Sequence, residues 1–80
     1  MNKEQILEKL QEIVRDVLDE EDIVLKEDTV PEDVDGWDSL AHISILAEIQ
    51  DTMDVTFQLD EIINLKSVGA IVDAIAEKLS

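Results

Sequence analysis

Two residues that could do chemistry, Ser39 and His42, lie three positions apart in this sequence. Residues three apart on a helix are neighbours on its surface, so the spacing first suggests a serine nucleophile with a histidine base. The 80 residues contain two glycines, one histidine and no cysteine, and they offer no glycine-rich turn or set of oxyanion donors. A hydrolase needs those parts as well as the pair, so we reject hydrolysis and expect a protein that is not an enzyme.

Ser39 is nevertheless well placed to be modified, because it follows Asp38 where a helix is expected to begin. Aspartate is a favoured N-cap residue. The first backbone N–H groups of a helix are unpaired, and the helix dipole is positive at that end, so a phosphate ester on the Ser39 hydroxyl would be stabilised. A serine at this position is also common without any function. For His42 we favour packing against the preceding loop, and contact with such a phosphate is the alternative.

Four helices are expected to position this serine, since no stretch of the sequence has a strong strand pattern. Asn2 with Gln5 resembles a capping box for the first helix. The second helix is apolar around most of its circumference, so we expect several neighbours to cover it. The predicted fold is an all-α four-helix bundle in one domain, residues 1–80, with a short third helix and a long loop between the first and second. The expected helices span residues 3–18, 39–53, 59–64 and, after a Ser67 cap, 68 to about 78.

The connection of residues 20–37 is long for a compact domain, which is typical of loops that are functional or well packed. Pro31 and Gly36 punctuate it. We expect this connection to lie against the helices, with Trp37 buried as its main anchor. Six spaced apolar residues would hold it there: Ile23, Val24, Leu25, Val30, Val34 and Trp37.

The formal net charge is −15, and the excess is concentrated in residues 19–38, which contain ten acidic residues and one lysine. Nucleic acids and anionic membranes would be repelled by this charge, whereas basic protein surfaces would be attracted. Solubility alone is the competing explanation of the charge. The apolar runs are too short to span a membrane, and the first residues lack the pattern of a signal peptide. We expect a cytoplasmic monomer.

The acidic loop also raises the possibility of a calcium site. In the EF-hand register that fits best, Asp33, Asp35 and Gly36 occupy positions 3, 5 and 6 of the loop. Pro31 and His42 then fall at positions 1 and 12, which both need carboxylates, so a true EF-hand is excluded. No specific set of metal ligands is predicted, and a calcium-responsive module that binds cations loosely through its acids remains an alternative.

The segment Asp38-Ser39-Leu40 at the start of the second helix, in a short acidic chain of four helices, resembles the acyl carrier proteins. The longer run Gly36-Trp37-Asp38-Ser39-Leu40 is similar to a variant found in many stand-alone carriers of this family. The similarity extends over nearly the whole chain, including Lys66-Ser67-Val68 at the start of the last helix. It implies that Ser39 is esterified by 4′-phosphopantetheine, which a separate phosphopantetheinyl transferase supplies from coenzyme A.

The resemblance also implies what this arm does. Its thiol would carry acyl or aminoacyl groups as thioesters and deliver them to ligases, synthases or transferases with basic docking patches. Two departures, Ser44 in place of a usual glutamate and the atypical His42, point to a specialised acyl or aminoacyl system. An acidic helical module that docks a basic partner without a prosthetic group is the alternative. By position, the residues expected to contact partners are Asp35, Asp38, Leu40, Glu48 and Asp51, and those expected to line a cargo slot are Ile43, Leu46, Ala47 and Ile62.

Overall fold

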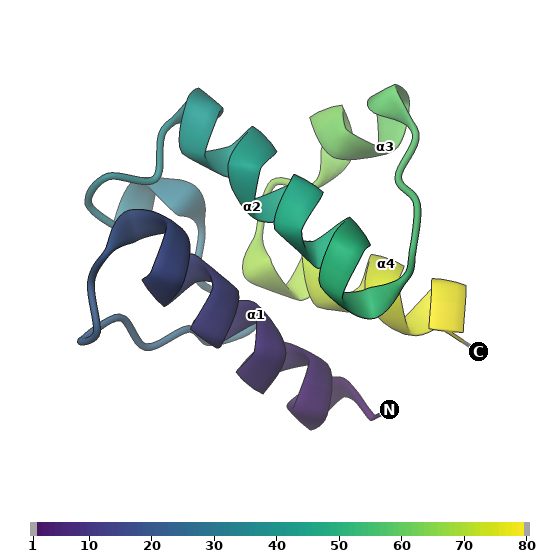
Figure 1. The fold of residues 1–80 in the computed structure, drawn as a ribbon, viewed down its shortest axis with the longest axis horizontal. Coiled ribbons are helices and arrows are strands. Elements are labelled where there is room, and N and C mark those ends of the chain that lie inside the picture. The colour runs from purple at the N-terminus through teal and green to yellow at the C-terminus, as the bar shows by residue number, and fades with distance from the viewer. Residues whose placement is uncertain (1, 80) are drawn as a thin grey trace.

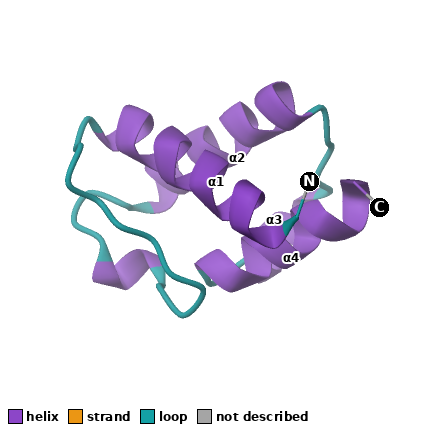
Figure 2. Ribbon diagram, turned by 90° about the horizontal axis from the view of Figure 1, so that it is seen from below, coloured by secondary structure: helices purple, strands orange, loops and turns teal. Residues whose placement is uncertain are grey.

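The computed structural model describes residues 2–79 and consists of helices joined by loops, with no strand in that part of the chain (Figure 1, Figure 2). α1 contacts both α2 and α4, and the N-terminal end of α1 lies on the same side of the molecule as the C-terminal end of α4 (Figure 1). The expected all-α fold with a short third helix is confirmed. The helices are α1 (Lys3–Leu18), α2 (Ser39–Met53), α3 (Leu59–Asn64) and α4 (Val68–Leu79), and a 3₁₀ turn covers Pro31–Asp33.

Local hydrogen bonds set the helix boundaries close to where the sequence predicted them. Asn2 and Gln5 form the expected capping box of α1, in which each side chain accepts from the other's backbone N–H at 2.9 and 3.0 Å. α1 stops before Asp19, which adopts a left-handed conformation with a φ of 55°. The Ser67 hydroxyl accepts a hydrogen bond of 3.1 Å from the Ala70 N–H, which confirms the expected cap of α4.

One hydrophobic core joins α1, α2 and α4 to the segments on either side of α2. Removing this aliphatic surface from water, worth about 25 cal/mol per Å², is the main force that assembles the helices. Trp37 and Phe57, the only aromatic residues in the sequence, are both buried at the edge of this core, as was expected for Trp37. The core side chains with no exposed surface are Ile6, Leu10, Val14, Ile45, Leu46, Ile49, Val68, Ile71 and Ile75.

The connection between α1 and α2 lies against the helices, as expected, but polar bonds hold it as well as apolar contacts. Arg15 Nε donates to the Ile23 carbonyl over 2.7 Å, and the Gln11 side-chain oxygen accepts from the Leu25 N–H over 2.9 Å. Five of the six expected anchors are buried or half-buried. Val24 was predicted wrongly, because its side chain is 64% exposed. In an extended segment adjacent side chains point to opposite sides, so Val24 turns outward where Ile23 and Leu25 turn inward.

α2 is less covered than its sequence predicts. Ile45, Leu46 and Ile49 are fully buried, but Leu40 and Ile43 are 75% and 58% exposed. The expectation that neighbours cover the whole apolar arc is therefore wrong over the first turns of the helix. The reason is the shortness of α3, whose 6 residues span about 9 Å against about 22 Å for the 15 residues of α2. α3 covers only part of α2 and leaves a groove beside its N-terminal end.

Candidate functional site

The Ser39 hydroxyl is exposed at the first position of α2, and it forms no hydrogen bond within residues 2–79. Asp38 is the N-cap, as predicted, and its side chain accepts from the Ala41 N–H over 2.8 Å. Its carbonyl accepts from the His42 N–H over 2.9 Å. The N–H groups of Ser39 and Leu40, by contrast, donate no hydrogen bond in the described part of the chain. The start of α2 therefore presents a free hydroxyl and two free donors at the positive end of a helix dipole.

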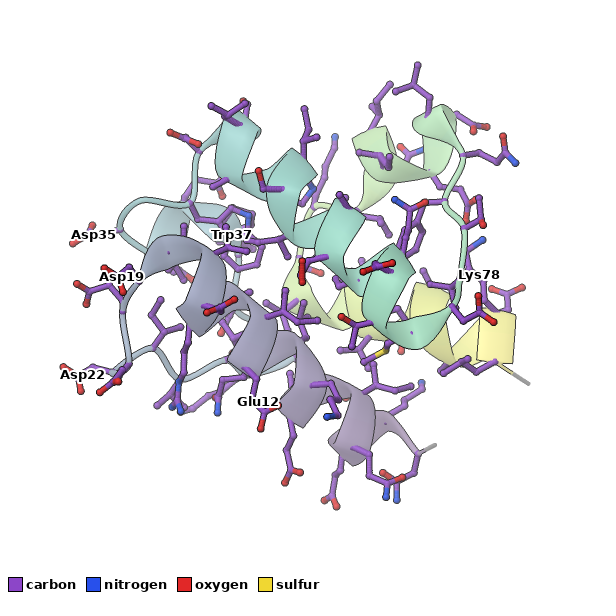
Figure 3. All side chains as sticks on the ribbon, in the orientation of Figure 1. Glu12, Asp19, Asp22, Asp35, Trp37 and Lys78 are labelled. Atoms are coloured by element: carbon purple, nitrogen blue, oxygen red, sulfur yellow. The ribbon has the colours of Figure 1, made fainter. Side chains whose placement is uncertain are left out.

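A sharp turn before α2 directs the chain into this position. Gly36 has a φ of +89°, which only glycine adopts without strain, and its carbonyl accepts from the Asp38 N–H over 3.1 Å. The Trp37 N–H donates to the Val34 carbonyl over 3.2 Å. In Figure 3 the Trp37 side chain turns toward the helices, whereas Asp35 lies on the outside of the loop. The buried indole thus fixes the loop, and the glycine lets the next residues reach solvent.

An open groove of about 810 Å³ begins at Ser39 and runs between α2, the 3₁₀ turn and α3. Most of its lining is apolar, which suits an alkyl chain or another apolar group better than a charged one. Lys66 is the only positively charged residue among the side chains that line it. The lining residues are Val30, Pro31, Glu32, Trp37, Asp38, Ser39, His42, Ile43, Ile62, Ile63, Leu65 and Lys66.

The four residues expected to line a cargo slot do not all meet at this groove. Ile43 and Ile62 line it together with Ser39. Leu46 lies in the main core with no exposed surface, and Ala47 is exposed elsewhere on α2; neither lines the groove. The reasoning from sequence found one α3 residue, Ile62, but missed Ile63 and the residues of the 3₁₀ turn. Ile63 could have been found from the sequence, because it is next to Ile62 and adjacent residues of so short a helix can border the same opening.

The five residues expected to contact partners are all exposed, and they lie on α2 or in the turn that precedes it. Leu40, directly after Ser39, is 75% exposed. α2 contains no lysine or arginine, so its acidic positions have no basic neighbour on the same helix. Their role in docking stays a prediction. The residues are Asp35, Asp38, Leu40, Glu48 and Asp51.

His42 packs against the preceding loop, as predicted, and also bonds to it in a way that was not predicted. The Trp37 Nε1–H donates to Nδ1 of His42 over 3.1 Å, and the two ring centroids are 6.0 Å apart. Partial burial lowers the pKa of His42 below its usual value, because the positive form is less well solvated there.

Hydrolytic and metal chemistry find no support in this arrangement. Nδ1 of His42 is occupied by Trp37, and Ser39 makes no hydrogen bond to the histidine. Within residues 2–79, no three histidine or acidic side chains are grouped so that they could hold a metal ion. The helices of that range are also too short or too polar to cross a membrane.

Comparison with known proteins agrees with the geometry of the site. A family model described as a phosphopantetheine attachment site matches residues 8–75. An acyl carrier protein from Exiguobacterium sibiricum is 35% identical over 75 residues, which cover 94% of this chain and 95% of that protein. The solution NMR structure of the holo acyl carrier protein from Geobacter metallireducens is 37% identical, covers 91% of this chain and 84% of its own, and superposes with a TM-score of 0.85.

The match to this solved structure concerns both fold and sequence, since the TM-score is 0.85 and more than a third of the aligned residues are identical. The family match includes the whole of α2 and the turn that leads into it. The chain therefore belongs to the acyl carrier protein family, and it is a non-catalytic carrier that uses a phosphopantetheine prosthetic group.

Proposed function

We propose that Ser39 is the residue that carries the 4′-phosphopantetheine arm. The observation that supports this most strongly is the free hydroxyl at the first position of α2, next to two unpaired N–H groups. A phosphodiester at that point would gain hydrogen bonds from those groups and a favourable interaction with the helix dipole. When bound, the arm supplies a thiol that holds an acyl or aminoacyl group as a thioester, which this chain without cysteine does not supply.

The other serines of the described chain fit this role less well. Ser67 also stands at the start of a helix, but its hydroxyl accepts from the Ala70 N–H over 3.1 Å and the residue is half-buried. Ser44 is exposed, but it lies within α2, where backbone N–H groups are paired in the helix. Among the serines within residues 2–79, only Ser39 combines exposure with free backbone donors.

The partners that this carrier requires are proposed from its charge and its exposed side chains. A phosphopantetheinyl transferase would load the arm, and acyl- or aminoacyl-loading ligases and synthases would use it. Their basic patches would dock on the acidic positions Asp35, Asp38, Glu48 and Asp51, with Leu40 as an apolar contact. Long-range attraction between such surfaces speeds encounter and weakens as salt is added.

The groove beside Ser39 is the proposed place for the cargo. Ile43 and Ile62 would contact an acyl chain there, whereas Leu46 is buried in the core and does not line the groove. Ala47, which was expected to line the slot, would have to act from outside the groove. Ser44 and His42 favour service in a specialised acyl or aminoacyl system, in which this chain, residues 1–80, would act as a single-domain cytoplasmic monomer.

The test is enzymatic loading followed by intact-mass measurement. The protein is incubated with coenzyme A, magnesium and a transferase of broad specificity, and it should gain the mass of one phosphopantetheine group. Ser39→Ala should gain none, whereas the matched variants Ser44→Ala and Ser67→Ala should still be loaded. Loading of Ser39→Ala, or no loading of the folded wild type by any transferase, would disprove the assignment.

A further inference from the structure

Trp37 and His42 form a hydrogen-bonded pair at the start of α2. Attachment of a phosphopantetheine arm to Ser39 does not by itself require this pair. The indole Nε1–H donates to Nδ1 of His42 over 3.1 Å. A neutral imidazole accepts at one ring nitrogen and donates at the other. Because Nδ1 is the acceptor, the proton of neutral His42 is on Nε2, and Trp37 holds the ring in that tautomer.

The Nε2–H of His42 is a free donor that solvent reaches. It has no hydrogen-bond partner within residues 2–79. Every buried side-chain nitrogen or oxygen in that range has a hydrogen-bond partner. Since Nε2 has none, it is not buried. His42 lines the same groove as Ser39. Side chains of a helix lean toward its N-terminus, which directs the ring toward the turn that begins at Ser39.

We propose that His42 binds the phosphodiester on Ser39 through its Nε2–H, and that Trp37 is the positioning residue that presents this donor. The inference rests on the proposed attachment at Ser39 and adds the side chain that orients the root of the arm. The free N–H groups of Ser39 and Leu40 supply the other donors. The phosphodiester would then be held by neutral donors close to a strongly acidic loop.

The charges around His42 make this contact measurable. Burial lowers the pKa of His42 in the unmodified protein, and protonation of Nδ1 would also break the bond from Trp37. A phosphodiester nearby adds a negative charge, which favours the imidazolium and raises that pKa. The other charged side chains on the groove are Glu32, Asp38 and Lys66. Carboxyl and amino side chains ordinarily titrate outside the range from pH 5 to 7, whereas histidine titrates within it.

The experiment follows the phosphodiester by ³¹P NMR in the full chain after loading, between pH 5 and 7 at constant ionic strength. A phosphodiester loses its only proton far below this range, so its resonance moves only if a neighbouring group titrates. We expect the resonance to move with the midpoint that ¹H–¹⁵N spectra give for the His42 ring. The same spectra should show a higher pKa for His42 in the loaded protein than in the unloaded protein.

Three variants make the result specific. His42→Gln should abolish the movement of the resonance, and Trp37→Phe should reduce it, because the tautomer is no longer fixed. Lys66→Gln changes a charge on the same groove and should leave the movement intact. A resonance that is constant in the loaded wild type, or that moves equally in His42→Gln, overturns the proposal. The intact mass is measured first, so failure to load would count against attachment at Ser39 and not against the role of His42.

Discussion

His42, the only histidine of the chain, lies beside the only tryptophan, and burial disfavours its positive form. In the unfolded chain its pKa returns to the usual value of about 6.5. The folded protein therefore binds fewer protons than the unfolded chain at pH values between the folded and the unfolded pKa. Stability from this residue is fully present above the unfolded pKa and is lost as the pH falls through the folded pKa.

This linkage predicts that acidification destabilises the wild type more than a variant without the histidine. The free energy of unfolding, measured with urea at pH 7.5 and at pH 5.5, should fall further in the wild type than in His42→Gln. Both proteins share the same carboxylates, so the effect of the carboxylates cancels when the change in the free energy of unfolding of one protein is subtracted from that of the other. The same fall in both proteins would show that His42 is protonated as easily in the folded state as in the unfolded chain.

The sequence predicted the parts of the site that depend on neighbouring residues. Asp38 as N-cap, Ser39 as the first helical residue and the burial of Trp37 all follow from local rules. The hydrogen bond between Trp37 and His42 could not be predicted, because it depends on how the turn at Gly36 rotates the indole. Such a rotation is set by contacts with the core, which spacing in the sequence does not contain.

At the scale of elements, α4 is joined to the long connection by two backbone hydrogen bonds. The Val68 N–H donates to the Thr29 carbonyl over 2.8 Å, and the Gly69 N–H donates to the Glu27 carbonyl over 2.9 Å. The first N–H groups of a helix have no partner within it, and here the loop supplies carbonyls for two of them. The loop that leads to Ser39 is thus held by α4 as well as by α1.

This contact leaves no space for a side chain at Gly69. A Cβ there would lie 2.7 Å from the Glu27 carbonyl oxygen, and the backbone atom that it meets cannot rotate away. Alanine favours a helix over glycine by up to about 1 kcal/mol, but overpacking of this kind costs about 1–3 kcal/mol. We expect Gly69→Ala to lose about 1 kcal/mol or more of the free energy of unfolding in urea. The control Glu8→Ala, on the exposed face of α1, should change it by less than about 0.5 kcal/mol.

α3 is too short to be stable alone, and Lys78 ties it to α4. The Lys78 ammonium lies 2.9 Å from Glu61 Oε2 and 5.4 Å from the centre of the Phe57 ring. Glu61 also accepts from the Gln58 N–H over 2.9 Å at the start of α3. That hydrogen bond first, and then Lys78, lower the pKa of Glu61. One lysine therefore supports both the start of α3 and its position over the groove.

Loss of this tie should be visible as faster hydrogen exchange in α3. Lys78→Gln should speed exchange of the Ile62 and Ile63 amides several-fold, while the amides of α1 keep their rates. Lys9→Gln serves as the control, because Lys9 pairs with Glu12 within α1 at 3.8 Å. Unchanged exchange in α3 would mean that apolar contacts alone hold the short helix.

Helix ends and loop anchors differ in how far the sequence could predict them. The bounds of α1, α2 and α3 were predicted closely, since capping residues act over three or four positions. The bonds from Gln11 and Arg15 to the connection cross 14 and 8 residues. Nothing in the sequence around Gln11 or Arg15 indicates which backbone group its side chain would bond. The incomplete covering of α2 at Ile43 was missed for a similar reason, because it depends on where α3 lies.

At the scale of the whole molecule, the acidic charge is mostly left without basic partners. Three lysines form the ion pairs found within residues 2–79, and none of them lies in residues 19–38. Figure 3 shows Asp19, Asp22 and Asp35 at the same end of the molecule. The protein measures 31 × 25 × 22 Å, so most of its acids lie within one Debye length of one another at about 0.01 M salt, where that length is about 30 Å.

Self-repulsion of this size predicts that salt stabilises the fold. Raising NaCl from about 10 to 150 mM shortens the Debye length from about 30 to 8 Å, which screens the acids in the compact state more than in the expanded chain. We expect a gain of about 1 kcal/mol, or about 4–8 °C in melting temperature for a domain of this size. A variant with Glu21→Gln and Asp22→Asn should melt higher at low salt and respond less to NaCl. A melting temperature independent of salt in both proteins would mean that these acids are already far enough apart to cost no stability.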